Sequence, residues 1–166
     1  MLPLREVIPP LTARALDGRT VQTAGYKQKR NLVLAFLHAH CSRCEDFLRR
    51  LAARAAELAE QEAAALVLYS ELPAGSLSQN LPPHLVRTTD LTGRSQRVYL
   101  GQEAFGPAGQ QRLGVFVTDR YGELFAQWVG SDEDALPGTE DVVSWLRRIE
   151  VACEECGAYH WLAEDR

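Results

Sequence analysis

NLVLAFLHAHCSRCEDFLRRL, residues 31–51, combines an apolar run, two cysteines and the beginning of a helical pattern. The run NLVLAFLH (31–38) has the length of a strand, and its unbroken apolar character is typical of a strand buried on both faces. From Cys44 the apolar residues recur at helical spacing through an alanine-rich stretch that reaches Glu62. The stretch therefore predicts a buried strand, then two cysteines, then a helix.

The rest of the chain alternates between strand and helix patterns. Four segments have the signature of regular elements: strands at 64–70 and 84–90, a hairpin at 113–130 and a helix at 139–156. A Pro/Gly/Ser-rich loop at 71–83 separates the first two of these segments. Residues 8–25 are interpreted as a loop-rich lead-in with a turn at Asp17-Gly18.

This order of elements predicts the fold class. A strand–helix–strand unit requires a right-handed parallel crossover, and the closing hairpin adds antiparallel strands. We therefore expect an α/β fold with a mixed central sheet and helices on both faces. The length of 166 residues is consistent with a single domain spanning 1–166, in which residues 151–166 form a C-terminal tail with its own CxxC motif.

Composition excludes several classes of partner. The net charge of −4 argues against binding to nucleic acids or to anionic membrane surfaces. The longest apolar stretch, LVLAFL (32–37), is too short to span a bilayer. The start MLPLREVIPP lacks the basic and apolar regions of a secretory signal, so we expect a cytoplasmic protein, whose thiols stay reduced.

All four cysteines fall into two CxxC pairs, Cys41/Cys44 and Cys153/Cys156. Cys41 is expected where the strand ends and the helix begins, where free amide groups and the helix dipole favour a thiolate. Cysteines in such positions have pKa values of about 3.5–7.5, against about 8.5 for a free thiol. Arg43 is expected to add positive charge, as is the neighbouring His40.

Cys44 lies one helical turn after Cys41, close enough for the two sulfur atoms to react. Cys41 would attack a disulfide or a peroxide, and Cys44 would resolve the adduct as an internal disulfide. Exposure at the end of the sheet is expected, because parallel α/β sheets place their sites there. We therefore predict Cys41 and Cys44 as catalytic residues.

Two other interpretations of HAHCSRC (38–44) are open. In one, the cysteines are inert buried thiols. In the other, His38 and His40 join the two cysteines as metal ligands. The metal interpretation is weakened because both histidines would share one side of a strand, with His38 facing the core.

Three segments resemble the redoxins, a group that comprises the alkyl hydroperoxide reductase/thiol-specific antioxidant proteins and thioredoxin-like oxidoreductases. IPPLTARALDGRTVQTAGYKQKRNLVLAFLHAHCSRCEDFLRRL (8–51) is similar to the opening of these proteins, with a DG turn before the buried strand and the active cysteine. LVRTTDLTGRSQRVYLG (85–101) resembles a peroxiredoxin strand, Asp turn and short helix, and VFVTDRYGEL (115–124) resembles their hairpin. The resemblance implies a thioredoxin-like fold.

The resemblance departs from both subfamilies at their sites. The peroxiredoxin motif PxxxTxxC is absent, because Leu34 and His38 hold the Pro and Thr positions relative to Cys41. The peroxidase arginine and the thioredoxin cis-proline both align with Leu113, although Arg112 is adjacent. The dithiol itself matches the thioredoxin-like oxidoreductases better, since FLHAHCSRC is similar to their FWAxWCxxC.

The second cysteine pair, in CEECGAYHW (153–161), has three interpretations. Cys153 can continue the apolar stripe of the last helix as a packing residue. Cys153, Cys156 and His160 can form part of a zinc knuckle. The pair can also act as an auxiliary redox relay that accepts the disulfide formed at Cys41.

We therefore predict a thiol-disulfide oxidoreductase, with a peroxiredoxin-like antioxidant peroxidase as the alternative. A non-catalytic zinc-binding or interaction domain is the rival from another class. The predicted substrates are protein or small-molecule disulfides or peroxides, and the predicted electron donor is a thiol reductant such as a thioredoxin system. No cofactor is required by this chemistry, although zinc at the C-terminal pair is one prediction.

Overall fold

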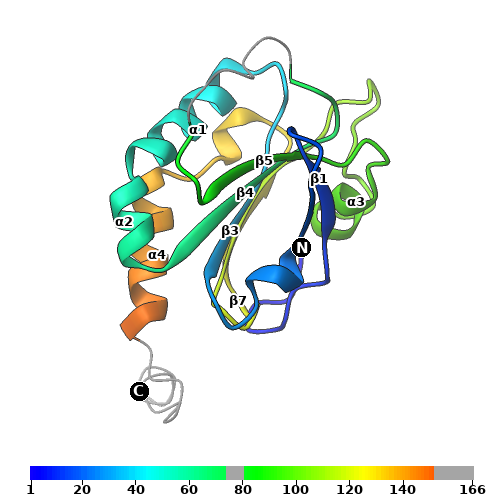
Figure 1. Cartoon of the computed structure of the whole chain (residues 1–166). Coiled ribbons are helices and arrows are strands. Elements are labelled where there is room, and N and C mark those ends of the chain that lie inside the picture. The colour runs from blue at the N-terminus through cyan, green and yellow to red at the C-terminus, as the bar shows by residue number, and fades with distance from the viewer. Residues whose placement is uncertain (74–80, 152–166) are drawn as a thin grey trace.

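A single mixed sheet organises the computed structural model, which describes residues 1–73 and 81–151 (Figure 1). Within those residues the sheet has seven strands in the order β2-β1-β5-β4-β3-β6-β7. The strands are β1 (Thr12–Ala15), β2 (Thr20–Gln22), β3 (Asn31–Phe36), β4 (Ala63–Tyr69), β5 (Leu85–Thr89), β6 (Leu113–Thr118) and β7 (Leu124–Gly130). The helical elements are η1 (Thr23–Tyr26), α1 (Ser42–Ala53), α2 (Ala55–Glu60), α3 (Arg94–Leu100), η2 (Glu133–Ala135) and α4 (Thr139–Val151).

β3 lies at the centre of the sheet and is buried along its whole length. It pairs in parallel with β4, so that Leu34 lies opposite Leu66, and antiparallel with β6, where Leu34 lies opposite Phe116. The predicted parallel crossover, the buried strands and the hairpin of β6 and β7 are therefore confirmed.

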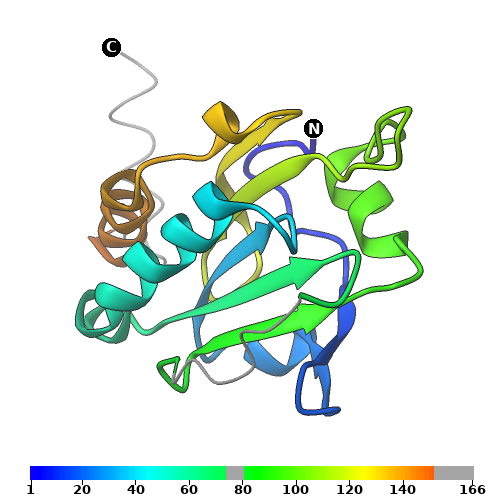
Figure 2. The ribbon, with the colours of Figure 1, turned by 90° about the horizontal axis from the view of Figure 1, so that it is seen from above.

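Alternate residues of β3 serve two separate cores, as the pleat of a strand requires. Val33 and Ala35 belong to a cluster that includes residues of α1, α2 and α4. Leu34 and Phe36 face the other cluster, where Phe36 packs against Tyr99 of α3 with ring centroids 5.3 Å apart. Figure 2 shows α1, α2 and α4 on one side of the sheet and α3 on the other, which confirms helices on both faces.

The helix predicted from Cys44 to Glu62 is wrong as one continuous element. It divides at Arg54, whose backbone (φ −97°, ψ 22°) departs from helical values, into α1 and α2. Arg54 at this break pairs with Glu57 at 2.8 Å and with Glu140 of α4. The alanine-rich composition favours a helix on both sides of the break, so local propensity does not predict it.

The loop-rich lead-in predicted at 8–25 is only partly correct. The turn at Asp17-Gly18 is present, with Gly18 at φ 92°, but it joins β1 and β2 as an antiparallel hairpin. β1 also pairs with β5, so the hairpin extends the edge of the sheet. These strands are short and carry little periodic signal, and their pairing depends on an element that lies far along the chain.

The last predicted helix is confirmed as α4 through Val151, and its predicted continuation to 156 lies outside the described residues. None of the described helices has the length and apolar character needed to cross a membrane.

Candidate functional site

Cys41 lies at the junction that the sequence predicts. β3 ends at Phe36, and a short loop carries the chain into α1, where Cys41 is the N-cap residue with extended backbone angles (φ −133°, ψ 121°). Its Sγ accepts a hydrogen bond from the amide of Cys44 at 3.2 Å. The sulfur therefore takes the role of a capping oxygen at a helix N-terminus, where the dipole favours negative charge.

Cys44 differs from Cys41 in its surroundings, although both are free thiols. Cys44 is 1% exposed and packs into the cluster beneath α1. Burial, followed by hydrogen bonding to Cys41, raises the pKa of the Cys44 thiol well above its usual range. Burial therefore favours the neutral form of the Cys44 thiol.

The expected exposure of Cys41 is wrong, because only 8% of its surface reaches solvent. The covering element is η2, whose Glu133 accepts a hydrogen bond from the Cys41 thiol at 3.1 Å. Arg43 of α1 pairs with Glu133 at 3.6 Å and also with Asp134. The connection from β7 to α4 therefore folds over the start of α1 and is held there by charge.

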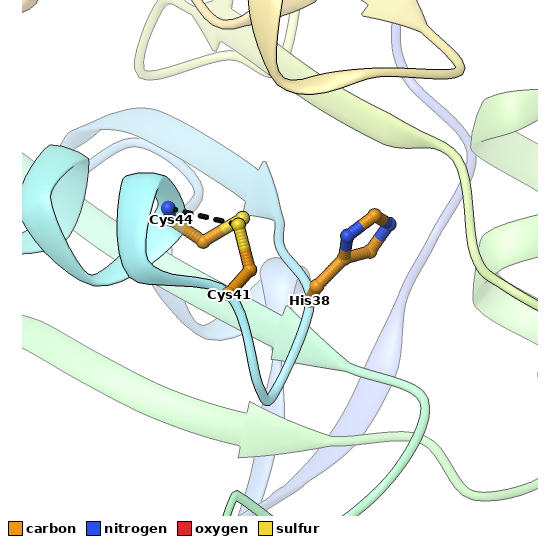
Figure 3. Close-up of side chains that lie close together, drawn as sticks. All are labelled: His38, Cys41 and Cys44. Atoms are coloured by element: carbon orange, nitrogen blue, oxygen red, sulfur yellow. Dashed lines mark hydrogen bonds between the residues drawn. The ribbon is translucent and has the colours of Figure 1, made fainter.

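His38 lies on the loop between β3 and α1, with its imidazole beside the two cysteines (Figure 3). Its Nε2–H donates to the carbonyl oxygen of Gln111, and the Gln111 side chain donates in turn to the carbonyl of Leu37 at 3.3 Å. One donor atom from each of His38, Cys41 and Cys44 lies within 4.8 Å of the other two.

The expectation that His38 faces the core and shares one side of a strand with His40 is wrong. The strand ends at Phe36, so its alternation does not extend to either histidine. His38 is half-buried and faces the cysteines, whereas the side chain of His40 is 56% exposed and lies 4.0 Å from Glu71.

Of the positions compared with the two redoxin subfamilies, His38 lies beside the dithiol and Leu113 belongs to the same cluster as the two cysteines, whereas Leu34 and Arg112 lie apart from it. Leu34 is fully buried and faces the cluster on the α3 side of the sheet. Arg112 donates from Nη1 to the carbonyl of Leu100 at the end of α3, at 3.2 Å. Leu34 and Arg112 are therefore directed to the α3 side of the sheet, whereas Cys41 belongs to the cluster on the side of α1, α2 and α4.

A cavity of about 480 Å³ is lined by His38 and by no residue of α1. Its lining includes His40, Arg97, Phe105 and Gln111. A second hollow of about 350 Å³ is lined by Arg43, Phe47, Glu133 and Pro137, among others. Neither cysteine lines these recesses, but each recess includes one neighbour of the dithiol, His38 in the first and Glu133 in the second.

Glu133 and Gln111 are the site residues that the sequence analysis missed. The acidic run SDED at 131–134 is a visible signal, but nothing local connects it to a cysteine 92 positions earlier. Cys153, Cys156 and His160 lie outside the described residues, so their relay and zinc hypotheses stay predictions.

The mixed sheet, the crossover and the helices on both faces define the thioredoxin-like fold. No protein-family model matches the chain, and no curated protein matches it. Among solved structures, the mitochondrial 2-Cys peroxiredoxin of Plasmodium falciparum matches with a TM-score of 0.72 and 13% identity, covering 89% of this chain and 94% of that one.

Two further solved structures have similar folds. The reduced 2-Cys peroxiredoxin of Plasmodium vivax matches with a TM-score of 0.71 at 13% identity, over 89% of this chain and 96% of its own. A putative thiol:disulfide interchange protein DsbE from Chlorobium tepidum matches with a TM-score of 0.64 at 16% identity, over 88% and 99%. At these sequence identities, the likeness to the solved structures shows a shared fold and no more.

Proposed function

We propose that this protein is a thiol-disulfide oxidoreductase in which Cys41 is the nucleophile and Cys44 the resolving thiol. The observation that carries the proposal is the Sγ of Cys41 at the N-cap of α1, with the Cys44 sulfur within 4.8 Å. A thiolate at Cys41 accepts the Cys44 amide and lies at the positive end of the α1 dipole. Reactive cysteines occur in such surroundings.

The unequal surroundings of the two thiols support the roles proposed for them. Cys41 retains some exposure and a backbone hydrogen bond, whereas the buried Cys44 has a raised pKa and stays protonated. Because hydrogen bonding to Cys41 is part of what raises the pKa of Cys44, reaction at Cys41 removes that contribution and makes Cys44 easier to deprotonate. The order of attack follows from this asymmetry.

The reaction proceeds by two exchanges. The Cys41 thiolate attacks one sulfur of a substrate disulfide, so that a mixed disulfide forms and the other substrate sulfur leaves as a thiolate that takes up a proton. Cys44 then loses its proton and attacks the Cys41 sulfur, which forms the internal disulfide and releases the second substrate thiol. One substrate disulfide becomes two thiols while the dithiol is oxidised, and a thiol reductant such as a thioredoxin system restores it.

Glu133 controls access to this chemistry. Its carboxylate accepts the Cys41 hydrogen bond and covers the sulfur, so an incoming disulfide must displace it. The side chain is 43% exposed and is paired with Arg43, so rotation towards solvent leaves it hydrated and still near a cation. The likeness to a thiol:disulfide interchange protein supports the same chemistry.

A redox titration of the full chain tests the proposal. The protein is equilibrated with graded mixtures of reduced and oxidised dithiothreitol, alkylated, and analysed by peptide mass spectrometry. We expect a Cys41–Cys44 disulfide that forms in a single transition and is lost in Cys41→Ser. In Cys44→Ser the Cys41 mixed disulfide with a substrate such as insulin should accumulate, because nothing resolves it.

The Cys153→Ser/Cys156→Ser double variant is the matched control for the second CxxC pair. It should retain the Cys41–Cys44 transition and insulin reduction. Oxidation confined to Cys153 and Cys156, or insulin reduction that persists in Cys41→Ser, would contradict the proposal, because the redox chemistry would then belong to other cysteines. Absence of both insulin reduction and a Cys41–Cys44 disulfide would leave a non-catalytic domain as the better hypothesis.

The likeness to two 2-Cys peroxiredoxins favours peroxidase activity as a second candidate. In that reaction the Cys41 thiolate attacks a peroxide oxygen and the O–O bond breaks. A sulfenic acid forms at Cys41, and the other oxygen takes up a proton and leaves as an alcohol or as water. Cys44 then condenses with the sulfenic acid, which forms the disulfide and releases water. The second CxxC pair is an alternative resolving group. Leu34 and His38 replace the Pro and Thr of the peroxidase motif, so we expect peroxide to react more slowly than disulfide. Peroxide consumption with dithiothreitol, measured beside insulin reduction, decides between the two.

A further inference from the structure

Three metal-binding donors meet at the dithiol. The two sulfur atoms of Cys41 and Cys44 and an imidazole nitrogen of His38 all lie within 4.8 Å of one another. A tetrahedral Zn²⁺ ion, with bonds of about 2.3 Å to sulfur and about 2.1 Å to nitrogen, separates its donors by roughly 3.5–3.8 Å. The three side chains therefore need to move inward by about 1 Å or less.

The orientation of His38 is the second observation that points to a metal. Its Nε2–H donates to the carbonyl of Gln111, and a carbonyl can only accept, so the neutral ring carries its proton on Nε2. The lone pair is then on Nδ1, and in Figure 3 the ring edge with Nδ1 faces the cysteine sulfurs. Metal-binding histidines are usually fixed in this way, with the outer N–H bound to a carbonyl or a carboxylate.

The chemistry of this donor set selects the ion. Two thiolates and one imidazole suit Zn²⁺, and their two negative charges neutralise it. Three protein ligands leave a fourth position for water, as in zinc sites that keep an open position. Arg43 pairs with Glu133 at 3.6 Å, which offsets the one further negative charge next to Cys41.

We propose that the reduced protein binds one Zn²⁺ ion through His38 Nδ1, Cys41 Sγ and Cys44 Sγ. Binding replaces the two thiol protons, which are released to solvent. The same sulfur atoms form the disulfide of the proposed oxidoreductase, so bound zinc and the disulfide exclude each other. This regulatory consequence rests on the proposed function, whereas zinc binding itself does not.

Oxidation then releases the metal. Two electrons pass from the two coordinated thiolates to a substrate disulfide, which takes up two protons and leaves as two thiols. The Cys41–Cys44 bond forms, and Zn²⁺ dissociates because a disulfide sulfur is a poor ligand for it. Zinc therefore protects the reduced dithiol from adventitious oxidation, and a substrate must compete with it.

The test uses the full chain with Cys153→Ser and Cys156→Ser, because the second CxxC pair is itself a thiol site for zinc. The reduced protein is titrated with Zn²⁺ against a chromogenic chelator, and native mass spectrometry gives the stoichiometry. We expect one ion per chain, lost in Cys41→Ser and in Cys44→Ser. In His38→Ala the affinity should fall by at least about tenfold, as expected when a ligand is removed.

His40→Ala is the matched control, because His40 lies on the same loop with a side chain that is 56% exposed. Its zinc affinity should equal that of the parent. Co²⁺ in place of Zn²⁺ should show thiolate-to-metal charge transfer and the visible bands of a tetrahedral ion, and both should weaken in His38→Ala but not in His40→Ala.

Three results would overturn the site: no zinc bound by the reduced Cys153→Ser/Cys156→Ser protein, unchanged affinity in His38→Ala, or zinc retained after diamide has formed the Cys41–Cys44 disulfide. The diamide experiment needs no substitution at the site, so it holds if a variant fails to fold. A protein that reduces insulin without binding zinc contradicts this inference alone. Zinc binding without a Cys41–Cys44 redox transition contradicts the proposed function alone.

Discussion

The thiol of Cys41 donates a hydrogen bond to the carboxylate of Glu133 at 3.1 Å, across 92 residues of sequence. The same sulfur accepts the amide of Cys44 at 3.2 Å. The two contacts act in opposite directions, because an amide donor stabilises a thiolate and a neighbouring carboxylate repels it. The reactivity of the dithiol therefore depends on how firmly η2 is held over the start of α1.

Removing the charge of Glu133 should make Cys41 more reactive. In Glu133→Gln the amide keeps the shape of the side chain but no longer repels a thiolate, and an effect of about 1 kcal/mol corresponds to about fivefold in rate. The rate of iodoacetamide alkylation of Cys41 at pH 7, followed by mass spectrometry, measures this. Asp134→Asn is the control, because Asp134 is 84% exposed and pairs with Arg43. An unchanged or slower alkylation rate in Glu133→Gln would show that the Glu133 carboxylate does not lower the reactivity of Cys41.

Gly130→Ala should weaken the hydrogen bond between Cys41 and Glu133, although a Cβ at residue 130 would lie within 4 Å of neither side chain in that bond. A Cβ at Gly130, the last residue of β7, would collide with the Cβ of Ala135 in η2. We expect η2 to shift, which loosens the Glu133 hydrogen bond and raises the alkylation rate of Cys41, with a loss of about 1–3 kcal/mol in stability from overpacking.

The control for this substitution is Gly25→Ala, because nothing lies within 4 Å of a Cβ built at Gly25. Urea unfolding and alkylation are measured on both variants. A destabilised Gly130→Ala protein with the parental alkylation rate would show that η2 does not control Cys41.

Cys44 should make the stability of the reduced protein depend on alkaline pH. Burial, then hydrogen bonding to Cys41, raises its pKa in the folded state above the unfolded value of about 8.5. The stabilisation is complete below that pH and declines above it, because the unfolded chain then releases the proton, with a slope of up to about 1.4 kcal/mol per pH unit.

Urea unfolding between pH 7 and pH 10 with reductant, on the Cys153→Ser/Cys156→Ser background, measures the slope. Cys44→Ala should flatten it. Tyr26 and Tyr99, whose pKa is raised by burial, contribute equally to both proteins, whereas the pKa of Tyr69 is raised by burial and, to a lesser extent, by the charge of Cys44, so its contribution is slightly smaller in Cys44→Ala. Equal slopes would mean that Cys44 does not titrate as the structure implies.

Asp90 should stabilise the turn between β5 and α3. Its carboxylate accepts the amides of Thr92 at 3.0 Å and Ser95 at 2.8 Å. Burial raises its pKa, but the hydrogen bonds from the Thr92 hydroxyl, the Ser95 amide and the other donors of the turn together outweigh burial and lower it overall. We expect Asp90→Ala to cost about 1–2 kcal/mol at pH 7, as the loss of a capping residue does.

The pH dependence of that loss follows from the lowered pKa. The contribution of Asp90 is present above the unfolded pKa of about 3.9 and disappears as the pH falls through the folded value. Parent and Asp90→Ala should therefore converge in acid-unfolding experiments below about pH 4. Asp17→Ala, at an exposed turn, should differ from the parent much less than Asp90→Ala does. A similar loss in both variants would contradict the capping role.

Local patterns predicted most of the sheet and the position of the dithiol. The run at 31–38 predicts β3, because an unbroken apolar stretch of this length is typical of a strand buried on both faces. The helical spacing of apolar residues after Cys44 predicts α1, because one face of that helix must be buried. The β1–β2 hairpin was missed because its place in the sheet depends on pairing with the distant strand β5, and the division of the helix at Arg54 was missed because the residues on both sides of it favour a helix.

Two thiols one helical turn apart at the end of a buried strand follow from the order of residues alone, because strand and helix periodicities are local properties of the chain. Their immediate neighbours do not. Gln111 orients His38 across 73 residues and Glu133 covers Cys41 across 92, and such hydrogen bonds leave no periodic trace in a sequence. The tertiary structure places the Gln111 loop and η2 beside the end of β3 and the start of α1. Their side chains therefore decide the solvent exposure, the charged surroundings and the reactivity of the two sulfur atoms.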